Sequence, residues 1–275
     1  MPTRLVHTTV AATLIVSAIV PLPAEAEPLP PTKPWAVDYG DTQCVALREY
    51  GDPKDPLTFA IRPAPNGETY ELILARKRGG PAFAEELQGA VAFGQGVPIK
   101  AWLLHYGLKG DKVEVYTFRI SASDMTQGRS ANAVTLRSGS RPNVTFGLTN
   151  MPALLQKLED CTADLKRYWN MDGVKIGTIA VNSKGDVRKI FSDEDYPSEA
   201  MTRRQEGTGQ FLLLINEQGR VAGCHVVKAS GVPALDGMGC QVIRERAKFT
   251  PARDKDGKPT RSTYITPPVT WRIAG

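Results

Sequence analysis

The chain has 275 residues and a mass of 29.9 kDa, which suggests two domains at a typical size of about 100–200 residues each. Hydrophobic residues make up 41% and charged residues 23%, so the chain can bury packed cores, and disorder along its whole length is excluded. The net charge of +5 is mild for this length and the basic residues are spread along the sequence, which argues against nucleic-acid binding.

The first 26 residues have the three parts of a secretory signal. Arg4 and the terminal amine form a basic start, Val10–Val20 carries no charge, and Ala24-Glu25-Ala26 supplies a small-x-small cleavage pattern. The apolar run is shorter than the about 20 residues that a membrane span needs. We therefore predict a signal peptide over residues 1–26 and a periplasmic protein after cleavage. The alternative is a retained inner-membrane anchor with the remaining chain facing the periplasm.

Four cysteines in an exported chain indicate two disulfides, because the compartment is oxidising. A metal site is the rival interpretation, but the sequence has no C-x-x-C pair and no histidine cluster, and we predict no metal. Three pairings are open, and the expected domain division favours Cys44–Cys161 and Cys224–Cys240.

Residues 27–34 form a proline-rich leader that we interpret as an extended tether. Residues 35–172 are predicted to be a strand-rich N-terminal domain of unknown role. A helix is expected over Met151–Trp169, where apolar residues recur every three or four positions and place Cys161 on the inner face. The expected strands of this domain are Leu57–Arg62, Thr69–Ala75, Ile99–Leu104, Lys112–Ile120, Val134–Arg137 and Asn143–Leu148.

Residues 173–192 are predicted to be a linker with one hairpin, Ile176–Val181 with Val187–Phe191, and residues 193–275 a second domain. The order expected there is helix, strand, strand, helix and strand, which predicts two helices on a three-stranded antiparallel sheet. The chain as a whole is thus assigned to the α+β class. The elements expected in the second domain are Ser198–Arg204, Phe211–Asn216, Arg220–Lys228, Val232–Lys248 and Arg261–Ile273.

The second domain carries a spaced series of residues from Tyr196 to Trp271 that resembles the C-terminal domain of TonB. The resemblance covers less than a third of the chain. The residues that carry it are Tyr196, Pro197, Ala200, Gly207, Gly219, Val221, Ser230, Gly231, Leu235, Asp236, Phe249, Pro251, Ala252 and Trp271.

This resemblance implies a protein-binding module that takes part in transport. Such domains bind the TonB box, a short segment of TonB-dependent outer-membrane receptors, which adds as a strand to an exposed sheet edge. They work with an inner-membrane proton-motive complex. The implied partner is therefore such a receptor, and the expected partner-binding edge comprises Ser262, Thr263, Tyr264, Ile265, Thr266, Val269 and Thr270.

The sequence departs from the family at several points. A folded domain replaces the long spacer, Gly209 stands at a usually apolar strand position, and Pro267-Pro268 interrupts the last strand. The alternative function is therefore a soluble periplasmic adaptor or scaffold that binds another envelope protein without proton-motive coupling.

Motifs for catalysis are missing from the sequence. It has no G-x-S-x-G, H-E-x-x-H, P-loop or G-x-G-x-x-G motif, and oxidised cysteines are poor nucleophiles. His105 and His225 are interpreted as structural. We therefore expect no enzymatic activity, no catalytic residues and no cofactor.

Overall fold

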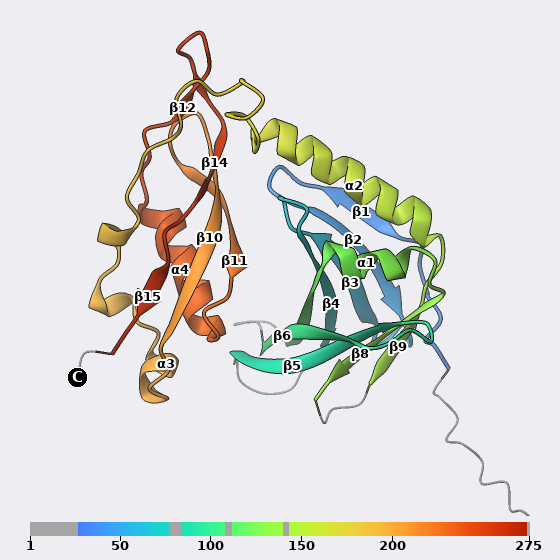
Figure 1. Cartoon of the computed structure of the whole chain (residues 1–275). Helices are drawn as coiled ribbons and strands as arrows, with labels where there is room; N and C mark the ends of the chain where they lie inside the picture. The colour runs from blue at the N-terminus through green and yellow to red at the C-terminus, as the bar shows by residue number, and fades with distance from the viewer. Residues whose placement is uncertain (1–26, 78–83, 108–111, 140–142, 274–275) are drawn as a thin grey trace, which may run out of the picture.

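The computed structural model describes residues 27–77, 84–107, 112–139 and 143–273 (Figure 1). A strand-rich N-terminal domain lies beside a smaller C-terminal domain, and a long helix and a connector join them. The strand-rich character of the first region is as predicted. The predicted signal peptide lies outside the described residues.

The N-terminal domain is built on one nine-stranded antiparallel sheet with the order β1-β2-β3-β4-β7-β6-β5-β8-β9. The sequence missed β1, β2 and β5 and placed the other six within a few residues of their bounds. The strands are β1 (Ala36–Tyr39), β2 (Cys44–Tyr50), β3 (Leu57–Pro63), β4 (Thr69–Lys77), β5 (Ala84–Phe93), β6 (Ile99–Gly107), β7 (Val113–Ser121), β8 (Ala133–Ser138) and β9 (Val144–Gly147).

The proline-rich leader is part of this domain. The amide of Leu29 donates to the carbonyl of Thr145 at 2.8 Å, and the amide of Gly147 donates to the carbonyl of Leu29 at 2.9 Å. On the leader's other side the amide of Thr32 donates to the carbonyl of Glu49 at 2.9 Å. The leader therefore forms isolated bridges to β9 and to β2, which lie near opposite ends of the strand order.

One helix packs against the concave face of the sheet. This is α2 (Met151–Tyr168), and its Leu154, Leu158 and Leu165 share a core cluster with Phe59 and Leu72 of the sheet. The Cys44–Cys161 disulfide joins β2 to α2 inside this core. A short helix, α1 (Ala122–Met125), and a 3₁₀ turn, η1 (Thr126–Arg129), connect β7 to β8.

The C-terminal domain combines helices with an antiparallel sheet, as predicted, but this sheet has four strands and not the three predicted. The expected last strand is split, so that β10 pairs with β14 along one half and with β15 along the other. A separate two-residue ladder, β12 with β13, lies outside this sheet. The elements are α3 (Ser198–Thr202), β10 (Gly207–Ile215), β11 (Val221–Lys228), α4 (Pro233–Arg246), β12 (Ala252–Arg253), β13 (Pro259–Thr260), β14 (Ser262–Ile265) and β15 (Val269–Trp271).

The central strand β10 is buried on both faces. Phe211 and Leu213 face α4 in the C-terminal core, and the second disulfide, Cys224–Cys240, joins β11 to α4 on that side. Leu214, on the opposite face, is fully buried in the core cluster of the N-terminal domain. The continuous apolar run of this strand is therefore explained by a helix on one side and the other domain on the other side.

The connector between the domains forms no hairpin within itself. Instead Val181 bridges to Arg253 and Lys184 bridges to Thr250. Val187 is buried in the C-terminal core, and the segment continues through two 3₁₀ turns, η2 (Arg188–Ile190) and η3 (Asp193–Asp195). The second half of the connector is therefore packed on the C-terminal domain.

Candidate protein-docking site

The sheet edge that faces away from the N-terminal domain is formed by β14 and β15 (Figure 1). The amide of Thr266 donates to the carbonyl of Phe211 at 2.9 Å, so this antiparallel pair is a hydrogen-bonded one. Along an antiparallel ladder, hydrogen-bonded residue pairs alternate with pairs that exchange no backbone hydrogen bond. The pairs of Thr263 and Ile265 are therefore the non-bonded ones, and the backbone N–H and C=O groups of these two residues point away from β10.

The two prolines sit at a bulge between β14 and β15. From Ile265 to Val269 the edge advances four residues, whereas the paired positions on β10 advance three, from Leu212 to Gly209. One extra residue on the edge is what defines a β-bulge. Because Pro267 and Pro268 occupy it, the prolines do not abolish the edge but divide it into two short strands.

Side chains of the expected edge residues are divided between core and surface. Ser262 and Thr266 are buried, and the hydroxyl of Thr266 accepts the amide of Phe211 at 3.1 Å. The side chain of Ile265 is 59% exposed. Thr270 is exposed and its hydroxyl lies 3.1 Å from that of Thr208. The exposed Ile265 next to unpaired backbone groups gives this edge an apolar contact as well as hydrogen-bonding capacity.

A groove of about 270 Å³ runs beside β15. Phe191 and Tyr196 contact Trp271 edge-on, with ring centroids 5.4 and 5.6 Å from it. Arg188 and Arg272 also line the groove. A segment paired with this edge would therefore meet aromatic rings and cationic groups.

Most residues of the family series build the domain and do not line the edge. Tyr196 donates its hydroxyl to the carbonyl of Gln205 at 2.6 Å, and Ala200 and Leu235 are fully buried. Gly219 has a φ of 72° and packs so tightly that a Cβ there would lie 1.8 Å from the carbonyl oxygen of Phe249. Among the others, Val221, Phe249 and Ala252 are buried, and Gly231 has a positive φ of 88°. The half-buried positions are Pro197, Gly207, Ser230 and Pro251.

Gly209, which departs from the family pattern, has a local reason. A Cβ at this position would lie 2.8 Å from Oδ1 of Asp236. The carboxylate of Asp236 accepts the amide of Ser230 at 3.0 Å, and burial raises its pKa above the ordinary value. The glycine on β10 therefore makes room for a buried carboxylate in the first turn of α4.

The opposite edge of the sheet, β11, faces the N-terminal domain (Figure 1). A contact that we call the latch holds the two domains together at the end of α2. Asn170 donates its Nδ2 to the carbonyl of Arg261 at 2.9 Å, and the guanidinium of Arg261 lies 3.8 Å from the ring centroid of Tyr168. Arg261 also pairs with Glu217 at 3.1 Å. The latch reaches the residue directly before β14.

His105 and His225 lie in different surroundings. His105 is buried in the N-terminal domain between Glu85 and Glu114, with N–O distances of 2.7 and 3.1 Å. His225 is on β11 beside the N-terminal domain, where burial and the positive charge of Arg62 lower its pKa to about 4. Neither lies in the β14–β15 edge.

The C-terminal domain is a small α+β domain joined to a strand-rich domain, and within the described residues no further strand lies beside β14. Residues 192–273 match the family model of the Gram-negative bacterial TonB protein C-terminal, which confirms the resemblance predicted for this segment. The C-terminal domain therefore belongs to a family of transport-related protein-interaction modules. Among curated proteins, none matches the chain. No helix of the described ranges is both long and apolar enough to cross a membrane.

Proposed function

We propose that the C-terminal domain docks an extended segment of a TonB-dependent outer-membrane receptor by adding it as a strand to β14–β15. The observation that carries this proposal is the asymmetry of the sheet. β11 lies against the N-terminal domain, whereas Thr263 and Ile265 on β14 direct backbone groups outward and have no second strand beside them in the described part of the chain. Unpaired backbone groups along a strand are a template for another strand.

The test uses the full chain and a synthetic peptide that contains a receptor TonB box, with a scrambled peptide as the control. Thr263→Pro removes an outward N–H without removing a bond to β10, since this residue is in a non-bonded pair. Thr263→Val keeps the N–H and nearly the same shape, and it is the matched control. We expect micromolar binding to the wild type and to Thr263→Val, and at least about tenfold weaker binding to Thr263→Pro.

Two outcomes would reject strand addition at this edge. One is the same affinity for all three proteins, which would place the peptide elsewhere. The other is no binding of any box peptide by the wild type, provided that circular dichroism shows a folded chain.

A second function, a soluble periplasmic adaptor without proton-motive coupling, is favoured by the latch. A folded domain is held directly on the docking domain by Arg261 and Asn170, where an energy transducer has a long spacer. The intact mass of the protein from cell envelopes distinguishes the two functions. A chain that starts at Glu27 and lacks four hydrogens is a periplasmic disulfide-bonded adaptor. A chain that retains residues 1–26 is tethered and available to an inner-membrane proton-motive complex.

A further inference from the structure

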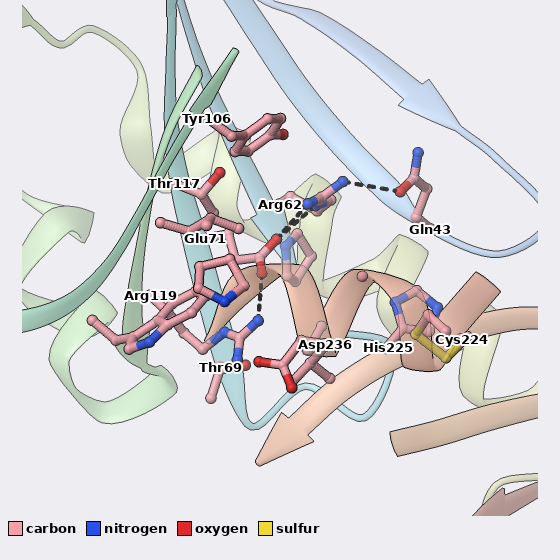
Figure 2. A pocket seen from close by; sticks show the side chains of 18 residues that line it. Gln43, Arg62, Thr69, Glu71, Tyr106, Thr117, Arg119, Cys224, His225 and Asp236 are labelled. Atoms are coloured by element: carbon pink, nitrogen blue, oxygen red, sulfur yellow. Dashed lines mark hydrogen bonds and ion pairs between the residues drawn. A yellow bond between two sulfur atoms is a disulfide. The ribbon is translucent and has the colours of Figure 1, made fainter. Parts of the chain in front are cut away.

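A cavity of about 310 Å³ lies between the two domains (Figure 2). The N-terminal domain contributes the outer face of β3, β4, β6 and β7, and the C-terminal domain contributes β11 and the first turns of α4. Ligand sites favour domain interfaces, and pockets of about 300–1,000 Å³ accept small molecules. This cavity has the size for a compact metabolite.

Two charged side chains of the cavity wall, Arg62 and Glu71, form an ion pair with each other. Arg62 donates its Nε and Nη2 to one oxygen of Glu71 at 2.8 and 2.6 Å, and its Nη1 to Gln43 at 3.3 Å (Figure 2). Burial disfavours the charged form of Glu71, but Arg62 and Arg119 outweigh this and hold its pKa below the ordinary value. This pair therefore forms a stable wall and leaves little bonding capacity for a ligand.

Arg119 keeps hydrogen-bonding capacity. Its Nη2 donates to the other oxygen of Glu71 at 2.9 Å, and its guanidinium lies over the ring of Trp102 at 4.7 Å. Within the described residues its Nε and Nη1 have no hydrogen-bond partner. The side chain is only 18% exposed. A partly buried guanidinium with open donors is suited to a carboxylate.

A carboxylate with open acceptor capacity comes from the other domain. Asp236 is 5% exposed, and both of its oxygens lie 3.0 Å from the same backbone amide, that of Ser230. One backbone N–H is thus shared by both oxygens, and because an ionised carboxylate offers about four lone-pair positions, acceptor capacity remains. Asp236 and Arg119 both line the cavity, so the two groups belong to one site (Figure 2).

The charged side chains of the cavity disfavour ligands that carry only a negative charge or only a positive charge. An anion at Arg119 would also meet the buried carboxylates of Glu71 and Asp236, and a cation at Asp236 would also meet Arg62 and Arg119. A molecule that carries both charges meets an opposite charge at each end. Apolar side chains also line the cavity, among them Leu104, Val226 and Pro233, and these can cover an apolar group.

We propose that this interdomain cavity binds a free α-amino acid with an apolar side chain. Its carboxylate pairs with Arg119, its ammonium pairs with Asp236, and its side chain lies against Trp102 and Leu104. Because the two charged contacts come from different domains, the ligand stabilises the joined arrangement of the domains by mass action. The proposal does not depend on what docks at β14.

The first test is calorimetric titration of the full chain with L-phenylalanine and L-leucine, then with every other standard amino acid. 3-Phenylpropanoate and phenethylamine, which each keep one charge of phenylalanine, are the matched ligands. We expect saturable one-to-one binding of an apolar amino acid and at least about tenfold weaker binding of both single-charge analogues, which is about 1.4 kcal/mol.

A variant that fills the cavity tests whether the ligand binds there, and it does so without removing a charged side chain. Gly237 on α4 lines the cavity, and a Cβ built there meets no atom within 4 Å. Gly237→Trp should fill the space and abolish binding, whereas Gly237→Ala should leave it unchanged. Arg119→Gln should weaken binding, and Arg203→Gln, which changes an exposed arginine outside the cavity, is its control.

The proposal is overturned by any of three results. The first is that no standard amino acid binds saturably to the folded full chain. The second is that wild type and a folded Gly237→Trp bind the amino acid equally well. The third is that an analogue with one charge binds as tightly as the amino acid.

Discussion

The two disulfides should differ in their contribution to stability, because they close loops of very different length. Cys44–Cys161 spans a sequence separation of 117 and Cys224–Cys240 spans 16. Loop-closure entropy in the unfolded chain then gives about 5 kcal/mol for the first and about 3 kcal/mol for the second. Cys44 and Cys161 are also buried, so their removal leaves a gap in the core that adds to the cost.

The assay compares the double variants Cys44→Ala/Cys161→Ala and Cys224→Ala/Cys240→Ala in guanidinium titrations followed by tryptophan fluorescence. Trp35, Trp102 and Trp169 report on the N-terminal domain and Trp271 on the C-terminal domain. Trp271→Phe isolates the signal of the N-terminal domain. The reduced wild type is the control and should lose stability in both domains.

The reasoning is refuted if the short-loop variant loses as much stability as the long-loop variant, or more. Equal stability of the oxidised and reduced wild type would refute it as well. Either result would mean that native packing, and not the unfolded chain, decides what the disulfides contribute.

Three further changes test other parts of the structure. His225 has a folded-state pKa of about 4, below its ordinary 6.5, so the unfolded chain binds more protons between these values. Stability should be complete above about pH 6.5 and fall as the pH drops towards about 4, and His225→Gln should flatten this part of the pH profile of denaturation midpoints. Gly209→Ala should lower the free energy of unfolding by about 1–3 kcal/mol, because the added Cβ meets Asp236. Gly237→Ala should raise the free energy of unfolding by about 1 kcal/mol, because alanine has the higher helix propensity. A thermal denaturation in which Gly237→Ala is the less stable of the two would contradict this packing. Arg261→Ala should weaken the latch by about 1–2 kcal/mol and speed hydrogen exchange of β14, and an unchanged exchange rate would show that the latch does not hold this strand.

The sequence by itself determined many of the local elements and the family of the C-terminal domain. The sequence placed a strand at Thr69–Ala75, which the structure extends to Lys77. The three- and four-residue spacing of apolar residues such as Leu154 and Leu158 located α2 within one residue. The turn glycine Gly219 was also evident from its place between two strands. These features depend on neighbours in the sequence, so their pattern is visible without a fold.

Only the tertiary structure decided which strands are neighbours and what covers them. Arg62, Glu71 and Arg119 come together because β4 pairs with both β3 and β7, and no local period encodes that pairing. The apolar run of β10 does not reveal that Leu214 packs on another domain. Likewise the leader has no strand signal, because it is rich in proline and its hydrogen bonds go to β9 and β2.

The docking edge shows the same division. The sequence indicated the last strand and its two prolines, but not that the prolines fall at a bulge where the edge gains one residue over β10. Register is a relation between two strands, and hydrogen-bond direction follows from register. The outward groups of Thr263 and Ile265 therefore became visible only when the two strands were placed side by side.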